Sequence, residues 1–324
     1  MQEKLQKIIS RIQNFSWLEI VGMTAIGILV LNSLFAVSLS IKVTRKPLLK
    51  KILGTSLQVT NQQPIAKTAV LSQAEQVNII PTEGVVLPVE WKNLGKNMVA
   101  GGVIDKTKIE ALYSQRGGMS EYMKKMLNEA DNQKIIITPQ NSGELLNLLW
   151  ALGLGNKSEI LDKGEMWDKK FGGDASKFAS TGGWTLAEGS VMDHYSKHSF
   201  IKLSSDQQTM VDRVSKGIFR PCCGNSTHFP DCNHGMAMLG LLQLMASQNV
   251  SEQDMYKYAL TVNAYWFPDT YLTIASFLKT QGKDYAKASP QELLSAQYSS
   301  SQGYRQILNQ VQPVQGKQSG GCGV

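Results

Sequence analysis

Residues Ile20 to Ile41 form the stretch that most constrains this chain, because none of them carries a charge. About 22 residues at about 1.5 Å of helical rise cover about 33 Å, which exceeds a hydrocarbon core of about 30 Å. Trp17 lies at the edge of the stretch, where interfacial aromatic residues are found. The pattern predicts a transmembrane anchor over residues 17–43, preceded by a short polar N-terminus at residues 1–16.

A cleaved signal peptide is the main alternative for this stretch. Its apolar region would be shorter, and only Ala36-Val37-Ser38 approaches a cleavage site. We therefore expect an uncleaved anchor and a single-pass protein of the cell membrane.

Much of the net charge of +7 flanks the apolar stretch. The flanking residues are Lys4, Lys7 and Arg11 before it and Lys42, Arg45, Lys46, Lys50 and Lys51 after it. Such charges are typical of membrane flanks, and no nucleic-acid-binding motif is present, so we do not expect nucleic acid as a partner. Their excess after the span favours a cytoplasmic domain. The Gln/Thr/Ser-rich tether that follows favours an extracytoplasmic domain, which we predict because long domains translocate largely regardless of flanking charge.

Composition changes divide the rest of the chain. Residues 44–84 are predicted to be a basic flank and flexible linker, and residues 309–324 a flexible Gly/Gln-rich tail. Between them, residues 85–308 carry repeated helix-start patterns, such as Asn141 with Glu144, Ser205 with Gln208, Ser251 with Asp254, and Ser289-Pro290. We predict a mainly α protein: one all-α globular domain with long irregular loops. Residues 134–138 are the one expected extended run.

The stretch from Arg220 to Gly235 contains three of the four cysteines and two of the four histidines. Thiolate sulfur and imidazole nitrogen together suit zinc, copper or iron. The spacing matches neither a zinc finger nor covalent c-type haem attachment. We predict a transition-metal site with Cys222, Cys223, Cys232 and His234 as ligands and His228 as a further candidate.

Two other interpretations of this stretch remain open. If Asp231 caps the following helix, Cys232 falls in its first turn, where the helix dipole stabilises a thiolate. Cys232 would then act as a redox or catalytic thiol, with His234 as the neighbouring base. Alternatively, Cys222 or Cys223 pairs with Cys232, and the disulfide stabilises an interaction module by about 2–3 kcal/mol.

Asp193-His194-x3-His198 offers a second candidate half-site. On a helix, residues four apart share a face, so His194 and His198 could act as metal ligands, alone or with the cysteine stretch. The methionines after that stretch fit helical core packing better than copper binding. Cys322, the only cysteine outside it, is expected to be an unstructured thiol, although it could serve as a further ligand or disulfide partner.

The segment Pro221-Cys-Cys-Gly-Asn-Ser-Thr-His-Phe-Pro-Asp-Cys-Asn-His-Gly-Met236 resembles a group of prokaryotic membrane-anchored proteins. It is also distantly similar to the Pro-Cys-Tyr-Cys-Gly-Cys lipoproteins, which have a cysteine cluster ahead of a helix. This chain departs from them in its adjacent cysteines and in lacking a lipobox cysteine. The resemblance implies an anchored domain with a cysteine site and carries no activity with it.

These observations predict a membrane-anchored metal-binding protein for sensing, trafficking or electron transfer. A binding role is favoured over catalysis. The alternatives are the thiol redox protein and the disulfide-stabilised module.

Overall fold

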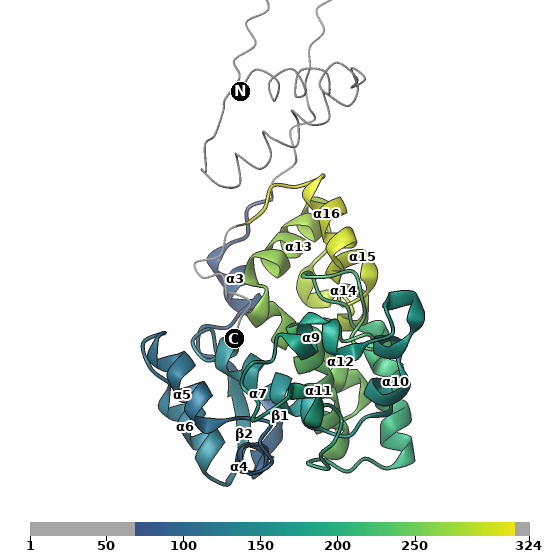
Figure 1. Cartoon of the computed structure of the whole chain (residues 1–324). Coiled ribbons are helices and arrows are strands. Elements are labelled where there is room, and N and C mark those ends of the chain that lie inside the picture. Colours follow the sequence, from purple (N-terminus) through teal and green to yellow (C-terminus); the bar gives the residue numbers. More distant parts are fainter. Residues whose placement is uncertain (1–68, 315–324) are drawn as a thin grey trace, which may run out of the picture. The chain divides into compact units, whose positions relative to one another are not determined.

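The structure is a computed structural model that describes residues 69–314 (Figure 1). The predicted anchor at residues 17–43, its flanks, most of the predicted linker and Cys322 lie outside the described residues. Within residues 69–314, no helix is both long enough and apolar enough to span a membrane.

The described part of the chain is mainly helical, as predicted. Its α-helices are α3 (Gln73–Ile79), α4 (Leu94–Ala100), α5 (Lys106–Ser114), α6 (Glu121–Asn128), α7 (Ser142–Gly155), α8 (Glu159–Lys163), α9 (Ala179–Gly182), α10 (Ser205–Gly217), α11 (Asn233–Ser247), α12 (Glu252–Trp266), α13 (Pro268–Thr280), α14 (Pro290–Leu293), α15 (Ala296–Ser299) and α16 (Ser301–Leu308). Short 3-10 turns are η1 (Glu165–Trp167), η2 (Lys169–Phe171), η3 (Ala175–Lys177), η4 (Val191–Asp193) and η5 (Tyr285–Lys287). Most of these turns lie between α8 and α10.

A two-stranded antiparallel sheet completes the fold. β1 (Val85–Lys92) pairs with β2 (Asp131–Ile137), which includes most of the predicted extended run. Alternate residues of β1 are buried, as expected for a strand with one face on the core. The Gln248 side chain bonds both the N–H and the C=O of Glu90 and so occupies part of the free edge of β1.

The packed region extends beyond residues 85–308 at both ends. Ser72 and Glu75 form a capping box that starts α3, inside the range predicted as linker. Ser276 Oγ on α13 donates to the carbonyl of Ala69. At the other end, Val311 is buried and the Val314 N–H donates to Thr273 Oγ1, so the segment after α16 also packs on α13.

Two predicted helix starts differ in detail. The capping box of α10 uses Ser204 and Gln207, one residue earlier than predicted. Asn141 precedes α7, but its side chain bonds the backbone of Thr138 and Ile136 instead of capping the helix. Glu144 instead accepts hydrogen bonds from the backbone and hydroxyl of Ser120, on the loop before α6. At α7, Asn141 therefore bonds residues just before it and Glu144 bonds a distant loop. Ser251, by contrast, caps α12 as predicted.

The centre of the domain is the crossing of α7 and α11, both buried along almost their whole length. The two helices lie together in the middle of Figure 1. They approach closely because glycines meet at the crossing. A Cβ on Gly153 would lie 2.0 Å from the Met236 carbonyl oxygen, and one on Gly240 would lie 2.4 Å from that of Leu149. This contact fixes α11, whose N-terminus follows the cysteine stretch directly.

Gly240→Ala should therefore destabilise the protein by about 3 kcal/mol or more, because neither backbone can move without repacking the core. Gly143→Ala is the matched control on α7, since a Cβ at that position would meet nothing within 4 Å. That control should be neutral or slightly stabilising, by up to about 1 kcal/mol. Free energies of unfolding from urea titrations test the pair, and equal effects of the two substitutions would contradict the close crossing.

Candidate metal centre

The cysteine loop, residues 219–231, is held in place by backbone hydrogen bonds at several points. The Phe219 N–H donates to the Leu294 carbonyl after α14, and the Ser301 N–H at the start of α16 donates to the Cys223 carbonyl. Both the N–H and the hydroxyl of Thr227 donate to the Ile218 carbonyl. The loop is thus anchored between α10 and α14–α16 although it contains no regular element.

Cys232 occupies the N-cap of α11, one position before the first turn in which the sequence analysis placed it. Asp231 does not cap the helix, because its carboxylate binds Arg220 and Asn225. His234, in the first turn, is buried against aromatic rings: its ring centroid lies 4.4 Å from that of Phe267 and 5.6 Å from that of Trp266. Helix geometry therefore presents a thiol and an imidazole at one helix end.

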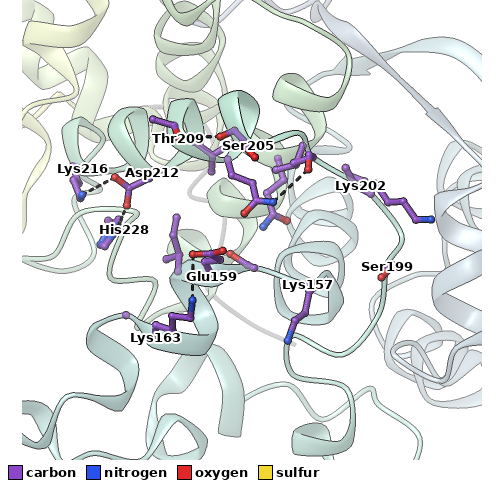
Figure 2. Close-up of a pocket in the computed structure, with 18 residues that line it drawn as sticks. Lys157, Glu159, Lys163, Ser199, Lys202, Ser205, Thr209, Asp212, Lys216 and His228 are labelled. Carbon is purple, nitrogen blue, oxygen red and sulfur yellow. Dashed lines mark hydrogen bonds and ion pairs between the residues drawn. The ribbon is translucent and has the colours of Figure 1, made fainter.

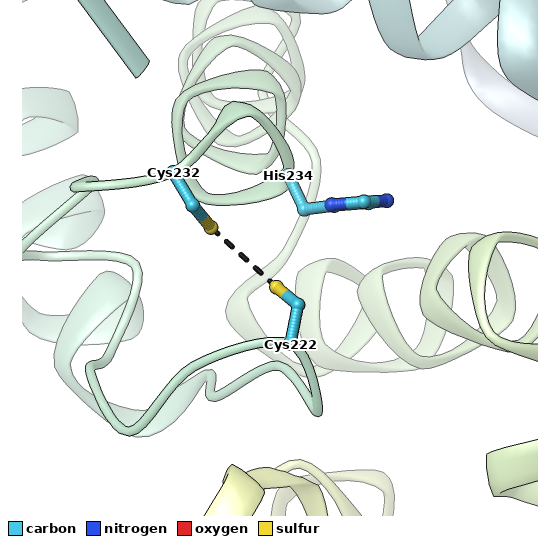
Figure 3. Close-up of side chains that lie close together, drawn as sticks. All are labelled: Cys222, Cys232 and His234. Carbon is cyan, nitrogen blue, oxygen red and sulfur yellow. Dashed lines mark hydrogen bonds between the residues drawn. The ribbon is translucent and has the colours of Figure 1, made fainter. Parts of the chain in front are cut away.

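The thiols of Cys222 and Cys223 lie close to that of Cys232, and Figure 3 shows Cys222 facing Cys232. Its Sγ lies 3.5 Å from Cys222 Sγ and 3.9 Å from Cys223 Sγ. These are free thiols, since a disulfide requires about 2.05 Å between sulfurs. Cys222 is exposed, while Cys223 and Cys232 are half-buried. Solvent therefore reaches the cluster from the Cys222 side.

Arg220 is the residue that organises the cluster, and its side chain is only 1% exposed. Its Nε donates to Cys232 Sγ over 3.1 Å, and its Nη2 donates to Asp231 Oδ1 over 2.6 Å. The remaining guanidinium bonds go to the carbonyls of Asn225 and Phe229. Gly235 makes this position possible, because a Cβ there would lie 2.4 Å from Arg220 Nη2. The buried charge is therefore compensated and hydrogen-bonded, as buried charges must be.

This environment separates the pKa values of the three thiols. Hydrogen bonds from Cys222 and Cys223, followed by the Arg220 charge and its hydrogen bond, hold the pKa of Cys232 well below that of an ordinary thiol despite burial. Donation to Cys223 and Cys232, together with burial, raises the pKa of Cys222. For Cys223, the hydrogen bond with Cys222 lowers the pKa, but donation to Cys232 and burial outweigh it and raise the pKa to about 12. Cys232 is therefore the most acidic thiol of the cluster.

His234 is neutral at physiological pH. Burial lowers its pKa to about 4, opposed in part by the Cys232 charge. A neutral imidazole is the form that binds metals, so protonation does not compete for His234 near pH 7.

The predicted ligands fall into two groups that share Cys232. Ligand atoms of Cys222, Cys232 and His234 lie within 4.8 Å of one another, and so do those of Cys223, Asp231 and Cys232. The second group already contains a cation, because the Arg220 guanidinium bonds both Asp231 and Cys232. The first group is therefore the better candidate for a metal ion.

The other histidines lie elsewhere. His228, although in the cysteine loop, directs Nδ1 to Glu165 and Nε2 to Asp212, at 2.9 and 2.8 Å. Both of its ring nitrogens are thus engaged by carboxylates, and it belongs to neither ligand group of the described residues.

The predicted half-site at His194 and His198 is not helical, because η4 ends at Asp193. The two rings nevertheless stack, with His194 Nδ1 3.1 Å from His198 Nε2. They pack on Gly101 and Gly102 and belong to neither ligand group of the described residues. The structure thus does not support a joint site with Cys232 and His234.

Sequence reasoning missed the role of Arg220. Its place directly before Pro-Cys-Cys was visible, but arginine is not a metal ligand and so gives no signal of a metal site. The glycine at position 235 was the available hint, since it leaves room for a close approach.

Arg220→Lys should shift the formation of the Cys232 thiolate to higher pH, because an ammonium group cannot reproduce the guanidinium's fixed set of hydrogen bonds. The measurement is the pH dependence of iodoacetamide modification, with the modified cysteine identified by mass spectrometry. In the unaltered protein, Cys232 should react at a lower pH than an ordinary thiol of pKa about 8.5. Arg213→Lys, at an exposed pair with Glu252, is the control and should change nothing. An unchanged profile in Arg220→Lys would remove Arg220 from this role.

Comparisons with known proteins add no relative to this description. No protein-family model matches the chain, and no match was found among curated proteins or solved structures. The function is therefore argued from the chemistry of the site.

Proposed function

We propose that this is a membrane-anchored metal-binding protein in which Cys222, Cys232 and His234 hold one transition-metal ion. The spacing of the sulfurs is the observation that carries this proposal. Two thiolates on one tetrahedral zinc ion, at about 2.3 Å from it, are separated by about 3.8 Å. The 3.5 Å between Cys222 and Cys232 and the 3.9 Å between Cys223 and Cys232 are both close to that value and far from a disulfide. His234 selects Cys222 as the second sulfur, because its ligand atom groups with those of Cys222 and Cys232.

Charge balance favours a divalent ion. Two thiolates neutralise one divalent cation, His234 is neutral, and Arg220 is balanced by Asp231. A monovalent copper ion would leave one negative charge in a partly buried site, which is unfavourable. Zinc, with its tolerance of mixed sulfur and nitrogen ligands, fits best among the candidate ions.

The chemistry of the site suits sensing or trafficking better than electron transfer. Zinc has no redox chemistry, and three protein ligands leave one coordination position for another group. Cys222 is the exposed ligand, so exchange with an incoming ligand would begin there. Cys232 and His234 are held by α11, and Cys232 also by Arg220, so they would retain the ion longest.

A thiol redox function is the second candidate, and the lowered pKa of Cys232 favours it. In that reaction the Cys232 thiolate attacks a partner disulfide and releases one thiolate. Cys222 then attacks the mixed disulfide and loses its proton, giving a Cys222–Cys232 disulfide and a second partner thiolate. Against this, the more exposed thiol is Cys222, whose raised pKa makes it the poorer nucleophile.

Substitutions of single ligands test the metal proposal. Protein purified without chelator should contain about one zinc per chain. The metal should be lost, or bound at least about 10-fold more weakly, in each of Cys222→Ser, Cys232→Ser and His234→Gln. Loss of a residue that only hydrogen-bonds a metal ligand already weakens metal binding by about 10-fold, and loss of the ligand itself should cost no less. Elemental analysis and cobalt substitution, read from thiolate-to-cobalt absorption, measure both effects.

Cys223→Ser and His228→Gln are the matched controls, since both residues lie in the same loop but outside the proposed ligand set. They should keep the metal. No metal in the unaltered protein, with cluster thiols that oxidise reversibly in pairs, would replace this proposal with the redox function. Loss of metal in Cys223→Ser but not in Cys222→Ser would move the ion to the other ligand group.

A further inference from the structure

Cys223 has no part in the proposed metal site, yet its thiol lies beside one of the ligands. Its Sγ is 3.9 Å from Cys232 Sγ, and its carbonyl accepts from the Ser301 N–H at the start of α16. A disulfide requires about 2.05 Å between sulfurs, so the two atoms need to approach by about 2 Å to form one. The cluster therefore holds a thiol that is not a ligand within reach of Cys232.

The surroundings of this pair of sulfurs are electropositive. Ligand atoms of Cys223, Asp231 and Cys232 lie within 4.8 Å of one another, and the Arg220 guanidinium bonds two of these residues. Cys223 and Cys232 are both half-buried and so keep part of their surface open to solvent. A nearby cation and partial exposure are the conditions under which cysteines become reactive.

The two sulfurs differ in protonation, which gives each a different role. Hydrogen bonds from Cys222 and Cys223, followed by the Arg220 charge, lower the pKa of Cys232, and the thiolate is the nucleophilic form. Cys223 keeps its proton near pH 7. The Cys232 charge is one of the effects that raise the pKa of Cys223, and the Arg220 charge opposes it. Oxidation of Cys232 to a neutral sulfenic acid would remove the first effect and leave the second, so Cys223 would then ionise more readily.

Access to the pair favours a small oxidant. Cys222 is the exposed thiol of the cluster, so a bulky protein disulfide would meet Cys222 first. A hydroperoxide is small enough to reach a half-buried sulfur. A cysteine of low pKa beside a second, resolving cysteine is also the usual arrangement in cysteines that respond to oxidants.

We propose that a hydroperoxide oxidises Cys232, that Cys223 closes a disulfide onto it, and that the loss of this ligand releases the metal ion. This regulation rests on the proposed function, because the ion leaves only if Cys232 holds it. It differs from exchange with a partner disulfide in its oxidant and in the cysteine that completes the reaction.

The chemistry proceeds in two steps. In the first, Cys232 Sγ attacks a hydroperoxide oxygen: an S–O bond forms, the O–O bond breaks, and the departing hydroxide or alkoxide takes a proton from solvent. In the second, Cys223 Sγ attacks Cys232 Sγ: the S–S bond forms, the S–O bond breaks, and the departing hydroxide takes the Cys223 proton and leaves as water. The hydroperoxide gains the two electrons that the two sulfurs lose. Cys222 and His234 then remain as an incomplete ligand set.

Treatment of the zinc-loaded, full-length protein with hydrogen peroxide tests the proposal. A chromophoric chelator should detect loss of the bound zinc, and mass spectrometry should find a Cys223–Cys232 disulfide. Reduction with dithiothreitol should restore both thiols and metal binding. Zinc that stays bound after the disulfide forms would overturn the proposal, and so would a Cys222–Cys232 disulfide in place of the expected one.

Variants identify the role of Cys223. Cys223→Ser should keep zinc before oxidation, but peroxide should leave Cys232 as a sulfenic acid that dimedone labels. His228→Gln is the matched control from the same loop, because its ring bonds Asp212 on α10 (Figure 2). This control should form the disulfide as the unaltered protein does.

Cys222→Ser separates this proposal from the proposed function. It should lose the metal, yet peroxide should still produce the Cys223–Cys232 disulfide, because neither sulfur has been changed. Absence of that disulfide would contradict the role of Cys223 whether or not the metal site exists. Absence of zinc from the untreated, unaltered protein would instead overturn the metal site and the release that depends on it.

Discussion

The buried guanidinium of Arg220 is the interaction on which the candidate site depends. Arg220 lies near the start of the cysteine loop and bonds Asp231 and Cys232 at the other end of it. It also bonds the Asn225 carbonyl in the middle of the loop. A buried cation without these partners would cost several kcal/mol, so the loop conformation and the charge stabilise each other. The same contact adds to the hydrogen bonds from Cys222 and Cys223 that lower the pKa of Cys232, and it places a cation in the second group of ligands. One side chain thus contributes both to the charge of the site and to the place left for a metal ion.

The position of this charge depends in turn on backbone contacts at glycines. Gly153 and Gly240 let α7 and α11 cross at close range, and Gly235 lets the guanidinium lie against the first turn of α11. α11 therefore packs in the core of the domain and carries the candidate metal site at its N-terminus. Cys232 is its N-cap residue and His234 lies in its first turn. A rigid, buried helix keeps the candidate metal ligands in a fixed geometry, as a preorganised site requires.

Several features could be predicted from the sequence because they depend on neighbouring residues. The Ser251 cap follows from residues within one helical turn, and the mainly helical character follows from apolar periodicity and repeated start signals. The density of thiols and imidazoles between residues 220 and 235 located the candidate site before any fold was known. Predictions that depended on distant partners failed. Glu144 did not complete a capping box at α7, because it bonds Ser120, and His228 is engaged by Glu165 and Asp212.

The sequence by itself determined which atoms are available: three clustered thiols, two nearby imidazoles and a helix that begins directly after them. Only the tertiary structure decided which of these atoms meet. It placed Cys222 beside Cys232 and His234, grouped Cys223 with Asp231, and held His194 and His198 in a pair of their own. It also gave Arg220 its role. The physical reason is that distances between side chains on different elements depend on packing, which local sequence patterns do not encode.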